Sequence, residues 1–189
     1  MIKLTFTEYL NSISPLSPAL KEELLSSLQI EEYKSHQIIN ASGQTENRLW
    51  FIYKGFVQAY YYDSAGKQHT LKFYQENDLI FSYNGFWKKP SDYYLETLQP
   101  SIMVSLSYKS AAKLFKYLET GDLARVFIMQ QYQEADFKLK LMNGSTKERY
   151  KQFREAHPEI FRKTTVGLIA SYLNMTREYL SRLMSDDFS

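Results

Sequence analysis

The spacing of apolar residues changes character along the chain. Leucines recur at helical spacing between Leu20 and Leu28, behind a Ser17-Pro18 pair in which serine caps the helix and proline suits its first turn. From about Glu32 to Ser107, short runs of aromatic and β-branched residues instead alternate with turn signals. The pattern predicts an N-terminal helix followed by many short strands.

The strand-rich region predicts an antiparallel β-sandwich or roll. Asp63-Ser64-Ala65-Gly66 lies between two strand-like runs and predicts a hairpin loop, with Gly66 suited to positive φ. Further strands are expected at Tyr93–Leu98 and Ile102–Leu106, before a short helix over about Tyr108–Leu118. Most of the 16 Tyr and 12 Phe fall in or beside this region, where aromatic residues form strands and fill cores.

A longer helix is predicted over 121–142, and it carries two apolar stripes. The first stripe has the spacing of a coiled-coil seam and consists of Ile128, Tyr132, Ala135, Leu139 and Met142. The opposite side carries Leu123, Val126, Phe127, Phe137 and Leu141. Two opposed stripes predict packing against the β-domain on one side and a second copy on the other. The alternative is a helix wholly buried within one subunit, but the polar run from Gln130 to Glu134 argues against it.

The C-terminal part predicts short helices with clear start signals. Asn143-Gly144 ends the long helix, and Ser145 with Glu148 forms a capping-box pattern ahead of a helix from Thr146 to about Ala156. The run from Thr165 to Ser185 then predicts two amphipathic helices hinged at Asn174, a residue that tolerates left-handed backbone. This is the outline of a DNA-reading helix-turn-helix.

The second helix of this pair has the residues of a base-reading surface. Thr176 can cap it, and Tyr179, Leu180 and Leu183 form its apolar face. Its other face carries Arg177, Glu178, Ser181 and Arg182. Arg can pair bidentately with guanine and Glu can accept from cytosine N4 in the major groove. An ordinary helical hairpin with charged residues facing water is the alternative at this point.

Composition adds limited support for DNA binding. The whole chain has a net charge of only +2, but residues 143–185 hold eight Lys or Arg and four Glu, a net charge of +4. Lys163 belongs to this basic segment and is a candidate for phosphate contact. The segment from Asn143 to the end falls back to +2 because of Asp186 and Asp187.

The sequence also argues against several other classes. With no cysteine, the chain has no disulfide, no thiolate nucleophile and no Cys ligand for a metal. No apolar run approaches the ~20 residues of a membrane span, and the N-terminus lacks a signal-peptide core, so we expect a soluble cytoplasmic protein. Only three histidines are present, without a His-x-His pair. We therefore expect no metal site, no catalytic residues and no enzyme activity, although a β-roll metal enzyme is a less favoured alternative.

The order of parts resembles the cyclic-AMP receptor protein and fumarate-nitrate reductase regulator (Crp/Fnr) family of bacterial transcription factors. The run from Thr176 to Arg182 is similar to the family's recognition helix, and the resemblance assigns base reading to Arg177, Glu178 and Arg182. It implies an α+β fold with an N-terminal antiparallel β-roll, a cyclic-nucleotide-binding-like jelly roll. The divisions expected are a sensor domain with flanking helices over 1–120, a dimerisation helix over 121–142 and a helix-turn-helix domain over 143–189.

Two departures from the family pattern matter. Where the family has Gly-Glu and Arg followed by a small residue in its phosphate cassette, this chain has Phe81-Ser82 and Ser91-Asp92. Binding of a cyclic phosphate needs the positive charge and the paired N–H groups of that Arg guanidinium. We therefore expect that cyclic AMP is not a cofactor of this protein. The candidate pocket for another effector is lined by Phe73, Ser82, Tyr83, Ser91, Asp92 and Tyr94. In addition, the short segment from Pro158 to Thr165 leaves little room for strands, so any wing is small or absent.

The expected function is therefore a sequence-specific DNA-binding regulator that acts as a homodimer through the helix 122–142. Its expected partners are double-stranded DNA and a second copy, with RNA polymerase as a further candidate and no membrane. The alternative is a ligand-binding or interaction module of the same fold that has lost DNA binding. Arg177, Glu178 and Arg182 together argue against that loss.

Overall fold

The computed structural model describes residues 1–187, which divide into two compact units. The first comprises residues 1–58 and 74–130, and the second comprises residues 59–73 with the chain from Gln131 onward. The boundary falls inside three elements, strand β4 (Val57–Tyr62), strand β5 (Gln68–Tyr74) and helix α5 (Glu119–Asn143). The functional division expected at residues 120 and 142 stays a prediction, because compactness alone does not assign function.

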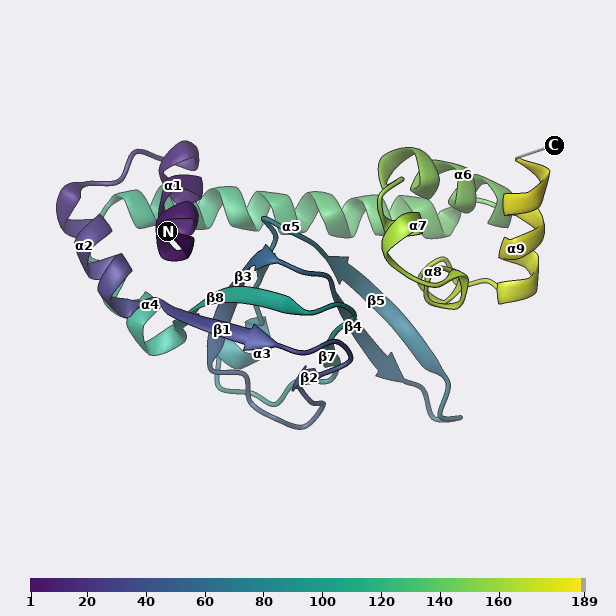
Figure 1. Ribbon diagram of the computed structural model, residues 1–189, viewed down its shortest axis with the longest axis horizontal. Helices are drawn as coiled ribbons and strands as arrows, with labels where there is room; N and C mark the ends of the chain where they lie inside the picture. The colour runs from purple at the N-terminus through teal and green to yellow at the C-terminus, as the bar shows by residue number, and fades with distance from the viewer. Residues whose placement is uncertain (188–189) are drawn as a thin grey trace. The chain divides into compact units, whose positions relative to one another are not determined.

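The first unit contains most of the strands. Its helices are α1 (Ile2–Ile13), α2 (Pro18–Ser27), α3 (Tyr83–Phe86) and α4 (Tyr108–Leu114). Its strands are β1 (Gln29–Tyr33), β2 (Ile38–Asn40), β3 (Arg48–Lys54), β6 (Leu79–Ile80), β7 (Tyr94–Thr97) and β8 (Ser101–Ser107). One antiparallel sheet has the order β1-β8-β3-β6, with Phe51 opposite Val104, and its strands β1, β8 and β3 run side by side in Figure 1. The other sheet has the order β2-β7-β4-β5, where β5 is Gln68–Tyr74.

The core of the first unit joins its N-terminal helices to a sheet. Phe6 and Phe51 are buried with ring centroids 4.8 Å apart, so α1 packs directly on β3. The leucines of α2 and the inner residues of β8 complete the cluster, which also includes Leu123 of α5. Burial of large apolar side chains of this kind, at about 1.5–3 kcal/mol each, holds the helices against the sheet.

The second unit contains the C-terminal helices. These are α6 (Thr146–Ala156), α7 (Ile160–Lys163), α8 (Val166–Tyr172) and α9 (Arg177–Asp186), which follow the end of α5 in Figure 1. Phe153 of α6 is buried at the centre of an aromatic group, with ring centroids 4.7 Å from Tyr172 and 5.8 Å from Phe161. Ile169, Leu173 and Leu180 add buried aliphatic surface beside it.

The predicted α+β fold with an antiparallel β-roll and a long helix is confirmed. The helix at Ser17, the hairpin at Asp63–Gly66 and the helix from Thr146 to Ala156 all form as the sequence predicts. The helix after Ser107 ends at Leu114, earlier than expected, while α5 begins at Glu119 and ends at Asn143. Helix α1 was not predicted, because its N-cap position is Met1, which makes no side-chain capping bond.

The two predicted faces of α5 differ in burial. Leu123 and Leu141 are buried, with Val126, Phe127 and Phe137 half-buried. Of the opposite stripe, Ile128 is 58% exposed, Tyr132 is 66% exposed and Leu139 is 63% exposed. The helix is therefore not wholly buried within one subunit. Among the helices of residues 1–187, none is both long and apolar enough to cross a bilayer.

Candidate nucleic-acid interface

The turn between α8 and α9 is a Schellman motif centred on Asn174. Asn174 has φ +51°, the left-handed backbone that the sequence predicts. Its N–H donates to the carbonyl of Ser171 at 3.2 Å, and the N–H of Met175 donates to the carbonyl of Ala170 at 3.0 Å. These two bonds are the paired closure typical of a helix that ends in a left-handed residue. The turn therefore sets the direction in which α9 leaves α8.

Helix α9 presents one polar face and buries the other. The Thr176 hydroxyl accepts a hydrogen bond from the N–H of Tyr179 at 3.2 Å and so caps the helix, as predicted. Leu180 and Leu183 are buried, whereas the opposite face exposes Arg177, Glu178, Ser181 and Arg182. The four polar residues named from the sequence thus share one exposed face near the N-terminal end of the helix.

A shallow groove of about 560 Å³ lies beside this face. Its lining includes Thr146, Asn174, Met175, Thr176, Glu178, Tyr179 and Arg182. The Arg182 guanidinium lies over the Tyr179 ring, 5.2 Å from its centroid, which restricts the directions that the Arg side chain can take. Thr146 and Tyr179 were not predicted as site residues. Thr146 carries no sequence signal for this role, because only the fold brings α6 beside α9.

Lys163 ends α7 and is half-buried, so it lies on a different element from the face of α9. Lys163 is not among the residues that line the groove, and its contact with phosphate stays a prediction.

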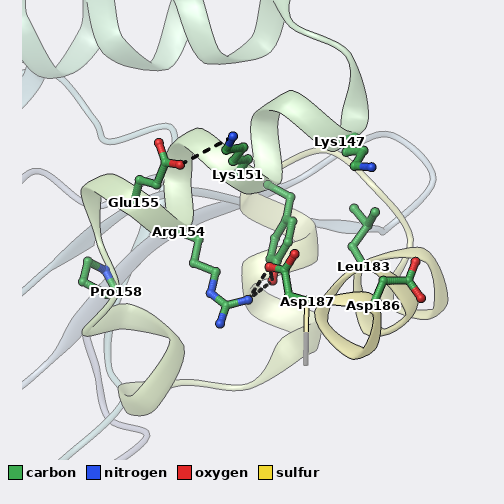
Figure 2. A pocket seen from close by; sticks show the side chains of 9 residues that line it. Lys147, Lys151, Arg154, Glu155, Pro158, Leu183, Asp186 and Asp187 are labelled. Carbon is green, nitrogen blue, oxygen red and sulfur yellow. Dashed lines mark hydrogen bonds and ion pairs between the residues drawn. The ribbon is translucent and has the colours of Figure 1, made fainter. Parts of the chain in front are cut away.

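Several of the basic residues counted in the sequence are engaged within the second unit. Arg154 forms an ion pair with Asp187 and also donates to the Tyr150 hydroxyl, and Lys151 lies 4.0 Å from Glu155. Figure 2 shows these pairs around a hollow of about 520 Å³ between α6 and the C-terminal end of α9. The carboxylates of Asp186 and Asp187 also line it, so this hollow mixes both signs of charge. The exposed face of α9 is the better surface for an anion such as DNA.

Residues 59–73 of the β4–β5 hairpin belong to the same compact unit, and β5 contacts α8. The Ser171 hydroxyl donates to the carbonyl of Gln68 at 3.1 Å and accepts from the N–H of Thr70 at 2.9 Å. Phe73 of the hairpin is buried with its ring 5.6 Å from that of Tyr172. Helix α8 is therefore hydrogen-bonded to residues of β5.

Residues of the candidate effector pocket divide between the two units. Phe73 lies in the second unit, and Ser82, Tyr83, Ser91, Asp92 and Tyr94 lie in the first. The hydroxyls of the two buried serines are engaged by nearby backbone. Ser82 accepts from the N–H of Gly85 at 3.0 Å and caps α3, and Ser91 donates to the carbonyl of Tyr93 at 2.8 Å. Tyr83 and Asp92 are exposed and Tyr94 is half-buried.

Glu46 is a buried acid of the first unit, packed against α3, that the sequence did not single out. It is 5% exposed, and burial raises its pKa to about 7 although the N–H groups of Asn47 and Arg48 both donate to it. A methyl group added at Gly85 would come within 2.4 Å of the Glu46 carbonyl oxygen, so α3 packs tightly on this segment. The only sequence signal was an acid between strand-like runs, which is commonplace.

Comparisons with known proteins agree with this architecture. Residues 30–117 match the family model of the cyclic nucleotide-binding domain. FixK2 from Bradyrhizobium japonicum matches with a TM-score of 0.72 at 15% identity, over 84% of this chain and 83% of that chain. The c-di-GMP responsive global regulator CLP from Xanthomonas campestris matches with a TM-score of 0.68 at 12% identity, over 90% and 91%. The chain has the Crp/Fnr fold.

A third Crp/Fnr structure covers the chain almost from end to end. The catabolite activator protein from Thermus thermophilus matches with a TM-score of 0.57 at 19% identity, over 94% of this chain and 85% of that chain. No curated protein matches the chain in sequence. At these identities the likeness concerns the Crp/Fnr fold, and the function has to be argued from the residues of this chain.

Proposed function

We propose that the protein is a sequence-specific DNA-binding transcriptional regulator. The observation that supports this most directly is the exposed face of α9, where Arg177, Glu178, Ser181 and Arg182 lie opposite buried leucines. A helix held in this way behind a tight turn enters the major groove with its N-terminal residues toward the bases. Arg177 and Arg182 then pair with guanine and Glu178 accepts from cytosine, each contact supplying about 1–3 kcal/mol of discrimination.

The regulator acts as a homodimer through α5 in this proposal. The stripe of Ile128, Tyr132 and Leu139 is apolar and more than half exposed, and its spacing is that of a coiled-coil seam. A two-fold pairing covers the same stripe on both copies. Two recognition helices then read half-sites about one helical turn apart, on a pseudo-palindromic operator.

The effector, if one exists, is not cyclic AMP in this proposal. Ser82 and Ser91 stand where the family's cassette has Glu and Arg, and their hydroxyls are engaged by backbone atoms of the same loops. Asp92 adds a carboxylate beside the position where the family has its Arg, whereas a phosphate needs cations. The likeness to CLP, whose title describes it as c-di-GMP responsive, supports the view that this fold accepts different effectors. RNA polymerase remains a candidate partner without assigned residues.

Base reading is tested by selecting DNA from a random pool with the purified protein and then comparing two variants. Arg182→Ala is expected to remove preference at one symmetric pair of base positions, at a cost of about 1–3 kcal/mol on the selected site. Lys163→Ala, on another helix, is expected to weaken binding to all DNA sequences more evenly and to lower the salt dependence of the affinity.

Equal loss on every sequence from Arg182→Ala would contradict the base-reading role. Selection of no DNA at low salt would favour the alternative, an interaction module that has lost DNA binding.

A further inference from the structure

The closure of α8 leaves carbonyl groups at its C-terminal end that need donors. The last carbonyls of an α-helix have no intrahelical partner. In α8, the carbonyls of Ala170 and Ser171 are taken by the Schellman bonds, which leaves those of Tyr172 and Leu173 and, in the turn itself, that of Asn174. The donors that reach these three carbonyls come from other helices.

Two basic side chains supply these donors. Lys138 of α5 donates through Nζ to the Tyr172 carbonyl at 2.5 Å, and Nζ also lies 3.1 Å from the centroid of the Tyr172 ring; burial lowers the pKa of Lys138 to about 7. Arg149 of α6 donates through Nη1 to the carbonyl of Leu173 at 3.0 Å and to that of Asn174 at 3.3 Å. The positive charge of Arg149 at this helix C-terminus also complements the helix dipole.

The guanidinium of Arg149 joins two segments that are distant in sequence. Its Nε donates to the carbonyl of Gly144 at 3.0 Å, in the loop that precedes α6, while Nη1 bonds the turn that precedes α9. A planar guanidinium can bond both sides at once because its N–H groups point in fixed, divergent directions. A lysine ammonium at the end of a flexible stem can bond only one side with comparable geometry.

We propose, on the basis of the function proposed above, that Arg149 is a positioning residue for the recognition helix. It holds the left-handed turn at Asn174 against α6 and so sets the angle at which Arg177, Glu178 and Arg182 meet the bases. By its charge alone, Arg149 belongs with the other Lys and Arg residues of 143–185 as a candidate for contact with DNA. Its hydrogen bonds to three internal carbonyls instead assign it to the support of α9.

The first test separates positioning from direct contact with DNA. The affinity of Arg149→Met for the selected operator and for an unrelated duplex is measured over a salt series, beside Arg149→Lys and the control Lys151→Met. Lys151 lies on the same helix and its side chain is 75% exposed. Arg149→Met is expected to lose about tenfold or more on the operator and about twofold or less on unrelated DNA, with an unchanged salt slope. The operator affinity of Arg149→Lys is expected to lie between that of Arg149→Met and that of the unaltered protein.

Lys151→Met is expected to change both affinities by the same small factor. If Arg149→Met instead weakens both duplexes alike and reduces the salt slope by about 1, Arg149 contacts a phosphate and the positioning role is wrong.

A second readout does not depend on DNA. Amide hydrogen exchange is measured in the free protein at Asn174 and Met175, whose N–H groups close the turn, and at Leu180 within α9 as a reference. Arg149→Met is expected to speed exchange at the two turn amides by about tenfold while Leu180 changes less. If Arg149→Met does not fold, Arg149→Lys is used for the same comparison.

Unchanged exchange in the turn of the folded variant would overturn the positioning role, whatever the DNA result. If the unaltered protein selects no DNA, the proposed function fails, and the exchange data still decide whether Arg149 holds the turn.

Discussion

Asn174 shows how a single residue type can determine local structure in this chain. The sequence places it between two apolar helical patterns, and the backbone there has φ +51° with both Schellman bonds formed. Thr176 and Ser145 are similar, because each hydroxyl caps the helix that follows it. These outcomes were predictable since a cap or a left-handed turn depends on residues within about four positions of one another.

Glu46 illustrates the opposite case at the same scale. Nothing in its neighbours marks it as buried, and its low exposure comes from α3 and the loops packed over it. Removing a carboxylate from water disfavours its charged form, which is why its pKa lies near 7. A contact between distant segments cannot be read from local spacing.

The raised pKa of Glu46 predicts a pH dependence of stability. Between its ordinary pKa of 4.5 and about 7, the folded state binds more protons than the unfolded state. The free energy of unfolding is therefore expected to fall as the pH rises through this range, by about 2 kcal/mol from this group. Glu46→Gln keeps an oxygen acceptor for the N–H groups of Asn47 and Arg48 and is expected to remove this part of the dependence.

Urea denaturation of the variant and the unaltered protein at pH 5 and pH 7 measures the difference. The exposed Glu76→Gln in the same unit is the control and is expected to leave the pH dependence as it was. A pH dependence in Glu46→Gln identical to that of the unaltered protein would show that Glu46 is ionised throughout.

At the scale of elements, start signals decided which helices were predictable. Helix α6 has a capping box at Ser145 and Glu148, and its predicted bounds match Thr146–Ala156. Helix α1 has no side-chain cap, although Phe6 and Leu10 recur at helical spacing and are buried. Its formation depends on packing against Phe51 of β3, which is a long-range contact. Tertiary packing thus stabilises a helix whose local signals are weak.

The exposed stripe of α5 carries the prediction that belongs to this scale. Leu139→Glu places a charge in the centre of an apolar seam and is expected to shift the protein from dimer to monomer in sedimentation equilibrium. Because Leu139 is 63% exposed in the single chain, the stability of the subunit itself is expected to change by about 0.5 kcal/mol or less. Operator affinity is expected to fall with dimerisation.

Gln133→Glu, exposed on the same helix but outside the stripe, is the matched control. A dimer that survives Leu139→Glu unchanged would place the contact between copies elsewhere.

At the scale of the whole molecule, the cassette region departs from the family pattern, whereas α9 keeps the exposed polar residues that the resemblance implies. The predicted order of a β-roll, a long helix and short C-terminal helices is confirmed, although α1 was not predicted, and within residues 1–187 no strand follows Ser107. The basic charge of the C-terminal segment is less available than its count implies, because Arg149 and Arg154 are engaged internally.

This combination predicts that cyclic AMP does not act on the protein. Isothermal titration of the full chain with cyclic AMP is expected to show no binding, and operator affinity is expected to be the same with and without the nucleotide. The physical reason is that Ser91 supplies no positive charge where the family has Arg and that Asp92 adds a carboxylate beside it. Cyclic AMP binding with micromolar affinity would contradict this account of the ligand end.

The sequence by itself determined the succession of a β-roll, a long helix and C-terminal helices, the caps, the turn at Asn174 and the polar face of α9, because each depends on residues close together in the chain. Only the tertiary structure decided that Glu46 is buried, that one stripe of α5 stays exposed and that Arg149 bonds the turn before α9. Those outcomes depend on which distant segments meet, and the burial and hydrogen bonding of a charged group follow from its neighbours in space.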